Sequence, residues 1–322
     1  MASQEEAGAE ESCLRKSIAS TFSKDIRISG MHIHYDKSHL LTKIKNIIRG
    51  PYKPIPNVSN PPILQSLAYG LSELLAELNR TRKEEVVITK TLDFKKYVIF
   101  HEKSAILLAK ALTHSIDYCQ HSDRDRALLF NSVWPVFFNF ERIWSSIFVF
   151  GSQNRNIIFF DDTQAFDEQF ASLSEQDLPA ESVKEMFQLF GSCNEFLLKS
   201  LYLPLKELVV EEDPIEFAYL IYQFMYGINE LEELSPSGRE IQKKVMKCIS
   251  NELHNHYTFT KNLDNYSYRL SEIMKTGSRA LTYVRMKSEV ILAARIFRLM
   301  DSTSLYFEKM DLSHPGLIYL MQ

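Results

Sequence analysis

The sequence is poor in the residues that break helices and in those that build disulfide scaffolds. It has 10 glycines and 11 prolines in 322 residues, each about 3% where globular proteins usually have ~7% and ~5%. So few turn residues argue against β-sandwiches, barrels and glycine-rich nucleotide folds, and predict long helices. The four cysteines lie far apart, at 13, 119, 193 and 248. We therefore expect neither a disulfide framework nor a cysteine metal cluster.

Familiar catalytic motifs are also missing. The chain has no Gly-rich phosphate loop, His-Glu-x-x-His, Gly-x-Ser-x-Gly or Cys-x-x-Cys, so we predict that it is not an enzyme and uses no cofactor. The pairs His32/His34 and His254/His256 have a spacing that converges on one metal only in a strand, and no metal site is expected. Adjacent Asp161 and Asp162 predict a solvated turn rather than an acid–base pair.

The sequence carries no recognisable export or membrane segment. Its first twelve residues hold four glutamates, no base and no apolar signal core. Its longest strongly apolar stretch, 143–150, is far short of the ~20 residues that cross a bilayer. Residues 13–53 hold nine basic residues against two acidic ones, whereas the remainder is mildly acidic. This basic arm is either a solvated linker or a nucleic-acid contact or import signal.

Proline separates the arm from the rest of the chain. Residues 50–62 contain five prolines, which excludes a regular helix and predicts a linker. We therefore expect an N-terminal arm and linker at 1–61 and one helical domain at 62–322. Apolar residues spaced by three and four predict the helices of this domain. They are expected at 62–82, 94–120, 180–190, 192–203, 214–227, 236–257, 263–300 (interrupted near Gly277) and 314–321.

The middle of the chain is its most apolar part. Ser122 is placed to cap a helix that runs to about residue 150, kinked or divided at Pro135. The turn-like residues 151–156 lie between Phe148-Val-Phe150 and Ile157-Ile-Phe-Phe160, which predicts a small hairpin. Six aromatic residues gather here, and either line a ligand cavity or fill an ordinary core: Phe137, Phe138, Phe140, Trp144, Phe148 and Phe150.

Five stretches, in order, resemble the ligand-binding domain of nuclear hormone receptors, especially the nematode-type group. The most specific is Tyr118-x-x-His121-x-x-x-Asp125-Arg126-x-x-Leu129-Phe130. It is followed by Trp134-Pro-Val-Phe137-Phe-Asn-Phe140-Glu141-Arg142. The other three are 205–210, 251–257 and 268–273. The resemblance covers about residues 62–322.

This resemblance implies an all-α, three-layer antiparallel helical sandwich with one small β-hairpin. The sandwich would enclose a cavity for a lipophilic ligand, present a coregulator groove and pair with another receptor, or with a second copy, through the helix at 263–300. The implied location is the nucleus, with the cytoplasm as a further option. The pocket is expected at Leu107, Lys110, Ala111, His114, Trp144, Ile147, Phe148 and Phe160, and the groove at Lys110, Thr113, Arg126, Leu129 and Phe130.

Two departures from the family pattern change the expected function. A receptor DNA-binding module needs two zinc sites of four cysteines each, so with four cysteines in all we expect no zinc-finger DNA reader and no direct DNA binding. The terminal residues 317–321 lack the acidic residue that closes the usual charge clamp. This argues against the usual mode of coactivator capture.

Three interpretations follow. The leading one is a receptor-like transcriptional regulator domain without its own DNA reader, which binds coregulators, a receptor partner and a lipophilic ligand. The second is a carrier or sensor of a lipophilic molecule without a transcriptional role. The third is a purely structural helical interaction module with a fully packed core. A retained ligand separates the first two from the third.

Overall fold

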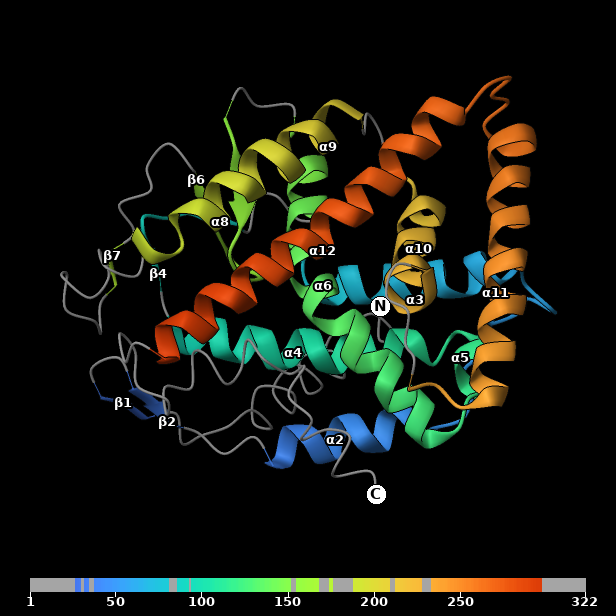
Figure 1. Cartoon of the computed structure of the whole chain (residues 1–322), viewed down its shortest axis with the longest axis horizontal. Helices are drawn as coiled ribbons and strands as arrows, with labels where there is room; N and C mark the ends of the chain where they lie inside the picture. Colours follow the sequence, from blue (N-terminus) through green and yellow to red (C-terminus); the bar gives the residue numbers. More distant parts are fainter. Residues whose placement is uncertain are drawn as a thin grey trace, which may run out of the picture.

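The computed structural model describes residues 27–29, 32–34, 38–80, 86–92, 94–151, 155–167, 174–175, 188–208, 212–227 and 233–296. Helices in three layers make up most of it (Figure 1). One outer layer holds α3 (Ile63–Glu77) and α4 (Phe94–Leu112). The middle layer holds α5 (Ile116–Gln120), α6 (Asp123–Phe150) and α10 (Pro214–Tyr222). The expected all-α sandwich is therefore confirmed.

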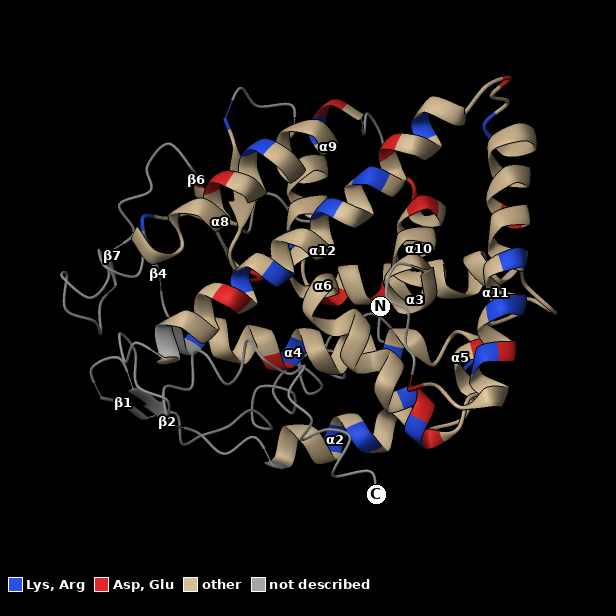
Figure 2. Cartoon of the chain, in the orientation of Figure 1, with Lys and Arg blue, Asp and Glu red and all other residues tan. Residues whose placement is uncertain are grey.

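The other outer layer comes from the C-terminal half. It contains α8 (Gly191–Phe196), the π-helical segment η3 (Leu197–Tyr202), α9 (Leu203–Leu208) and α12 (Ser267–Ile296). α11 (Pro236–Asn255) instead packs beside α10 and contacts α3. The π-helical segments η4 (Gln223–Gly227) and η5 (His256–Thr260) extend α10 and α11. Charged residues form bands along α11 and α12 (Figure 2), as expected for helices with one face in water.

Helix α3 shows how periodicity and capping define an element. Its leucines at 64, 67, 71 and 74 are all buried, which fits the helix expected at 62–82. Pro62 offers no capping side chain. Instead, Glu252 of α11 accepts the N–H groups of Ile63 and Leu64 at 2.9 and 2.8 Å. A carboxylate at this end satisfies free donors and suits the helix dipole.

Three of the expected helices differ from the sequence prediction. The stretch 94–120 is two helices, because α4 ends at Leu112 and Ser115 starts α5 by accepting the N–H of Tyr118 at 3.0 Å. Pro135 does not divide α6, which is one 28-residue helix. Nor does Gly277 interrupt α12. Most of 180–190 and all of 314–321 lie outside the described residues.

The hairpin is present, but it begins later than the sequence suggests. Phe148-Val-Phe150 completes α6, and β5 (Ile157–Phe159) pairs antiparallel with β6 (Gln164–Asp167). β3 (Val87–Ile88) adds a parallel third strand beside β6. Two further strand pairs are β1 (Arg27–Ser29) with β2 (His32–His34), and β4 (Thr91–Leu92) with β7 (Ser174–Glu175).

The turn of this hairpin is not fully solvated, contrary to expectation. The Asp161 side chain is buried, and its Oδ1 accepts the N–H groups of Thr163 and Gln164, both at 2.7 Å. Asp162 is more exposed and pairs with Lys103 of α4 at 2.8 Å. The acidic pair therefore shapes the turn and ties it to α4.

A buried ion pair joins this hairpin to the helices. Arg80, just after α3, donates from Nε and Nη2 to the two carboxylate oxygens of Glu141 in α6, at 2.7 and 3.2 Å. Its Nη1 donates to the Asp161 carbonyl at 2.8 Å, and its guanidinium lies 4.0 Å from the centre of the Phe159 ring. Each side chain of the pair is only 2% exposed. Three elements thus meet at one guanidinium.

A further helix lies inside the range expected to be an arm. α2 (Ser38–Ile48) packs against α4 and the start of α6 (Figure 1). Leu40, Ile44 and Ile48 are at most 4% exposed and belong to the main core. None of the described helices is long and apolar enough to cross a membrane.

Candidate ligand pocket and coregulator groove

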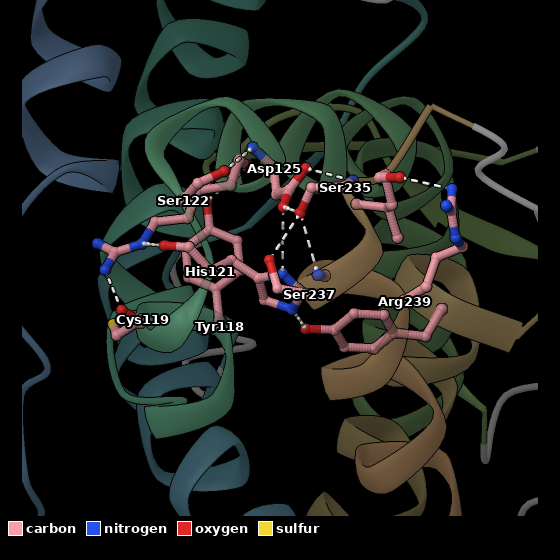
Figure 3. A network of polar contacts seen from close by, with 12 residues as sticks. Tyr118, Cys119, His121, Ser122, Asp125, Ser235, Ser237 and Arg239 are labelled. Carbon is pink, nitrogen blue, oxygen red and sulfur yellow. Dashed lines mark hydrogen bonds and ion pairs between the residues drawn. The ribbon is translucent and has the colours of Figure 1, made fainter.

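The most specific sequence stretch forms a polar network at the corner between α5 and α6 (Figure 3). Ser122 caps α6 by accepting the N–H of Asp125 at 3.2 Å. The Asp125 carboxylate then accepts the backbone N–H of Ser235 at 3.1 Å and its hydroxyl at 2.5 Å. Ser235 in turn caps α11 by accepting the N–H of Gly238. Asp125 therefore joins the first turns of two helices.

A histidine beside this aspartate is neutral in the folded protein. Burial lowers the pKa of His121 to about 4, and the nearby Arg126 charge contributes although Asp125 opposes it. The His121 Nε2 lies 2.9 Å from the hydroxyl of Tyr226 in η4. The His121–Tyr226 hydrogen bond therefore joins two neutral side chains. Protonation of His121 in acid is expected to destabilise the corner between α5 and α6.

Arg126 makes the largest set of contacts at this corner. Its Nε donates to the His121 carbonyl at 3.0 Å and its Nη2 to the Cys119 carbonyl. Its Nη1 donates to the carbonyls of Ile48 and Gly50, at 2.9 and 3.0 Å. One guanidinium therefore closes the α5–α6 corner and also holds the C-terminal end of α2.

Part of the expected coregulator groove lies near α2, because Arg126 donates to the Ile48 carbonyl. Leu129 and Phe130 are fully buried in the main core. Thr113 is buried, and its carbonyl accepts the N–H of Lys53 at 2.9 Å. Lys110 is exposed in the last turn of α4. The chain's own N-terminal residues therefore run along this region.

The residues expected to line the pocket lie on several faces. His114 faces α3, where it contacts the Tyr69 ring and lies 3.3 Å from the carboxylate of Glu73. α3 and α4 are so close here that a Cβ at Gly70 would come within 2.9 Å of the His114 ring. Leu107, Ala111 and Ile147 are buried in the core.

The aromatic members of the expected pocket fall into two groups. Trp144 packs 5.1 Å from Phe217 of α10 and 5.3 Å from Phe148, measured between ring centroids. Phe160 instead stacks on Tyr97 of α4 at 4.7 Å. The structure thus places Trp144 with Phe148, and Phe160 with α4. Within the part of the chain that the structure describes, the buried indole N–H of Trp144 has no hydrogen-bond acceptor, which is costly unless another group supplies one.

Two cations that no sequence pattern singles out share one hydrogen-bond acceptor. Arg142 of α6 and Lys287 of α12 both donate to the Asn139 side-chain oxygen, at 3.3 and 3.0 Å. The Arg142 guanidinium lies 4.7 Å from the centre of the Phe138 ring and 5.9 Å from that of Tyr97. Within the described residues neither cation has a carboxylate partner.

These two charges disfavour each other. Burial, together with the nearby Arg142 charge, lowers the pKa of Lys287 to about 7. Because both bonds end on one oxygen, the charged groups are at most about 6 Å apart, within the range of strong like-charge effects. An anion bound between them would relieve this repulsion.

A surface hollow of about 390 Å³ lies beside the hairpin. Its lining is Val87, Lys96, Ile99, Phe100, Lys103, Asp162, Thr163 and Gln164. None of these was expected to line the pocket. The Lys103–Asp162 ion pair is part of this lining, so the hollow combines apolar side chains with charged ones.

The described part of the chain holds no group of three or more His, Cys, Asp or Glu side chains suited to a metal. His254 and His256 have different partners, as their helical spacing suggests. His254 Nδ1 lies 2.6 Å from the Tyr266 hydroxyl, and His256 Nε2 lies 2.8 Å from a carboxylate oxygen of Asp213.

Comparisons with known proteins agree with the motifs in the sequence. Nuclear hormone receptor family member nhr-213 of Caenorhabditis elegans is 26% identical over 287 residues, which cover 88% of this chain and 66% of that protein. Member nhr-98 of the same organism is 23% identical over 314 residues, 92% of this chain and 66% of that protein. The chain thus spans just under two thirds of the length of these relatives.

The ultraspiracle ligand-binding domain from Drosophila melanogaster is similar in structure, with a TM-score of 0.48 and 11% identity, over 77% of this chain and 97% of that one. A family model describing the ligand-binding domain of nuclear hormone receptors matches residues 82–297. This match covers more than half of the chain and includes α4, α6, the hairpin and α12. The protein therefore belongs to the nuclear hormone receptor ligand-binding-domain family.

Proposed function

We propose that the chain is a ligand-regulated transcriptional regulator domain that works in the nucleus, through coregulators and a receptor partner. Family membership over residues 82–297 is the observation that carries this proposal. With four cysteines in the sequence, the chain would reach DNA through a partner rather than through zinc fingers of its own.

A reporter assay tests the transcriptional part. The chain is fused to an unrelated DNA-binding domain, and transcription from that domain's site is compared with the unfused domain. A regulator changes reporter output. Unchanged output, together with a retained small molecule in the purified protein, would instead support the carrier, and no change without any bound molecule would support the structural module.

The two cations support an anionic ligand. An apolar molecule with an anionic end would place its charge between Arg142 and Lys287 and its body against Tyr97 and Phe160. Ligand sites of this kind combine mostly apolar walls with a few polar anchors. The carboxylate would accept charge-assisted hydrogen bonds, which are stronger than those to a neutral group.

Native mass spectrometry and thermal unfolding test this ligand class with two probes. A long-chain fatty acid should bind and raise the unfolding temperature, whereas the alcohol of the same chain length should bind more weakly. Lys287→Met should reduce the difference in affinity between the acid and the alcohol. Lys275→Met, at an exposed residue of the same helix that pairs with Glu272, should leave this difference unchanged. Equal binding of acid and alcohol to the wild type would reject the anionic ligand.

The other expected pocket residues remain a prediction. The unsatisfied Trp144 N–H supports a ligand acceptor near α10 as a second option. A Trp144→Phe variant keeps most of the aromatic surface and removes the donor. If it binds the retained ligand as tightly as the wild type, Trp144 is only a core residue.

Pairing is proposed to use α12. Tyr268, Leu292 and Ile296 of this helix are 76%, 57% and 67% exposed. Exposed large apolar side chains along one helix are a typical feature of protein interfaces. They support the dimer surface expected at 263–300.

A further inference from the structure

Helix α2 has the form of a docked ligand rather than of a linker. Its buried residues Leu40, Ile44 and Ile48 repeat every four residues, whereas Thr42 and Asn46 are exposed. An isolated helix of 11 residues is marginal in water. The contacts with α4 and α6 must therefore supply most of its stability.

The C-terminal end of α2 is held by charge. The last carbonyls of a helix lack partners inside it, and here Arg126 donates to the carbonyls of Ile48 and Gly50. A cation at this position also suits the helix dipole. Three residues after Gly50 the chain continues across the end of α4, where Lys53 N–H donates to the Thr113 carbonyl. The bond to the Ile48 carbonyl uses a backbone atom of α2, so any helix of similar length could make it.

One electrostatic interaction in this arrangement is unfavourable. Burial lowers the pKa of Lys43, and the positive charge of Lys110 lowers it further, although Glu102 opposes the effect. Lys43 thus brings a positive charge to a surface that already carries one. A helix with an acidic residue at this position would gain attraction instead of repulsion.

We propose that α2 occupies the coregulator groove of its own chain and that a partner helix binds by displacing it. The partner carries aliphatic residues at positions i, i+4 and i+8, with an acidic residue one position before the middle one, where α2 has Lys43. This inference rests on the proposed function in one respect, that Lys110, Thr113, Arg126, Leu129 and Phe130 form the groove. It adds that the groove is closed until α2 leaves.

The test uses two synthetic peptides and the full chain. One peptide has the sequence of residues 36–50, and the other has the same sequence with Lys43→Glu. Each is labelled, and binding is followed by fluorescence anisotropy. The chain variant Ile44→Asp/Ile48→Asp places two charges on the buried face of α2, which should detach this helix from α4 and α6. Asn46→Asp, on the exposed face, is the matched control.

The expected result is an ordered series. The double variant binds the peptide, whereas the wild type and Asn46→Asp bind it at least about tenfold more weakly, because α2 competes as a tethered ligand. The Lys43→Glu peptide binds about fivefold more tightly than the native one, as expected when a like-charge contact becomes an opposite-charge contact. Hydrogen exchange on the wild type adds a measurement that needs no variant. The α2 amides lose protection when the Lys43→Glu peptide is bound.

The possible failures are distinguishable. Equal binding to wild type and double variant, or binding while the α2 amides stay protected, overturns self-occupancy and leaves the coregulator groove standing. Absence of binding to a folded double variant removes the groove as a helix-docking surface, and with it that part of the proposed function. If the double variant does not fold, Ile44→Ala replaces it, and equal peptide affinity of this variant and wild type overturns the proposal.

Discussion

The Arg80–Glu141 pair offers a sharp test of how the three layers hold together. Glu141→Ala leaves the Arg80 guanidinium, 2% exposed, without its carboxylate and also removes an acceptor from the Ser145 hydroxyl at 2.8 Å. Breaking a buried pair by removing one partner costs about 3–5 kcal/mol. Urea unfolding followed by circular dichroism should show this loss in the free energy of unfolding.

A matched control and a double-mutant cycle complete this test. Glu195→Ala removes an exposed carboxylate paired with Lys199 at 2.7 Å and should leave the urea midpoint unchanged. Arg80→Met combined with Glu141→Ala should cost at least about 2 kcal/mol less than the sum of the single changes. Additive costs, or a Glu141→Ala variant as stable as Glu195→Ala, would refute the reasoning.

Three further predictions concern the polar corner and α12. His121 has a folded pKa of about 4, below the unfolded value near 6.5, so the unfolded state binds more protons between these pH values and the free energy of unfolding falls as pH drops through them, by at most about 3 kcal/mol. His121→Gln should flatten this dependence in urea titrations at several pH values, and an unchanged slope contradicts it. Gly238→Ala should lower the unfolding temperature, because the new Cβ would lie 2.7 Å from a carboxylate oxygen of Asp125, whereas Gly191→Ala meets nothing within 4 Å and should not destabilise; equal effects would contradict the crowding. Leu292→Asp should weaken self-association about tenfold in analytical ultracentrifugation if α12 pairs, and a dimer of unchanged affinity would place the interface elsewhere.

Much of the helical framework was predictable from the spacing of apolar residues. The stretches 62–82 and 236–257 each have one apolar face, 214–227 is apolar almost throughout, and each contains a helix at close to the expected residues. The first strand of the hairpin was misplaced, because Phe148-Val-Phe150 consists only of apolar residues and is the end of α6. A short run of this kind has no period that separates helix from strand.

Helix α2 and the buried polar contacts were not predictable in the same way. The basic composition of residues 13–53 drew attention to charge, so the four-residue spacing of Leu40, Ile44 and Ile48 was not recognised. Arg80 and Glu141 are 61 residues apart and Asn139 and Lys287 are 148 apart. No local pattern links such residues, since only the tertiary fold brings them together. The Asp125–Ser235 contact is of the same kind, although the resemblance had already marked Asp125.

The length of α12 has a mechanical consequence. Near its start Arg269 pairs with Glu216 of α10, and toward its other end Lys287 bonds Asn139 of α6. Eighteen residues of unbroken helix lie between them, a rod of about 27 Å. A rotation imposed at Lys287 must therefore either be transmitted to the Glu216 pair or be absorbed by bending the helix. α12 would then couple two distant polar contacts mechanically. The stiffness of its middle turns would determine how much of a rotation at Lys287 reaches the Arg269–Glu216 pair.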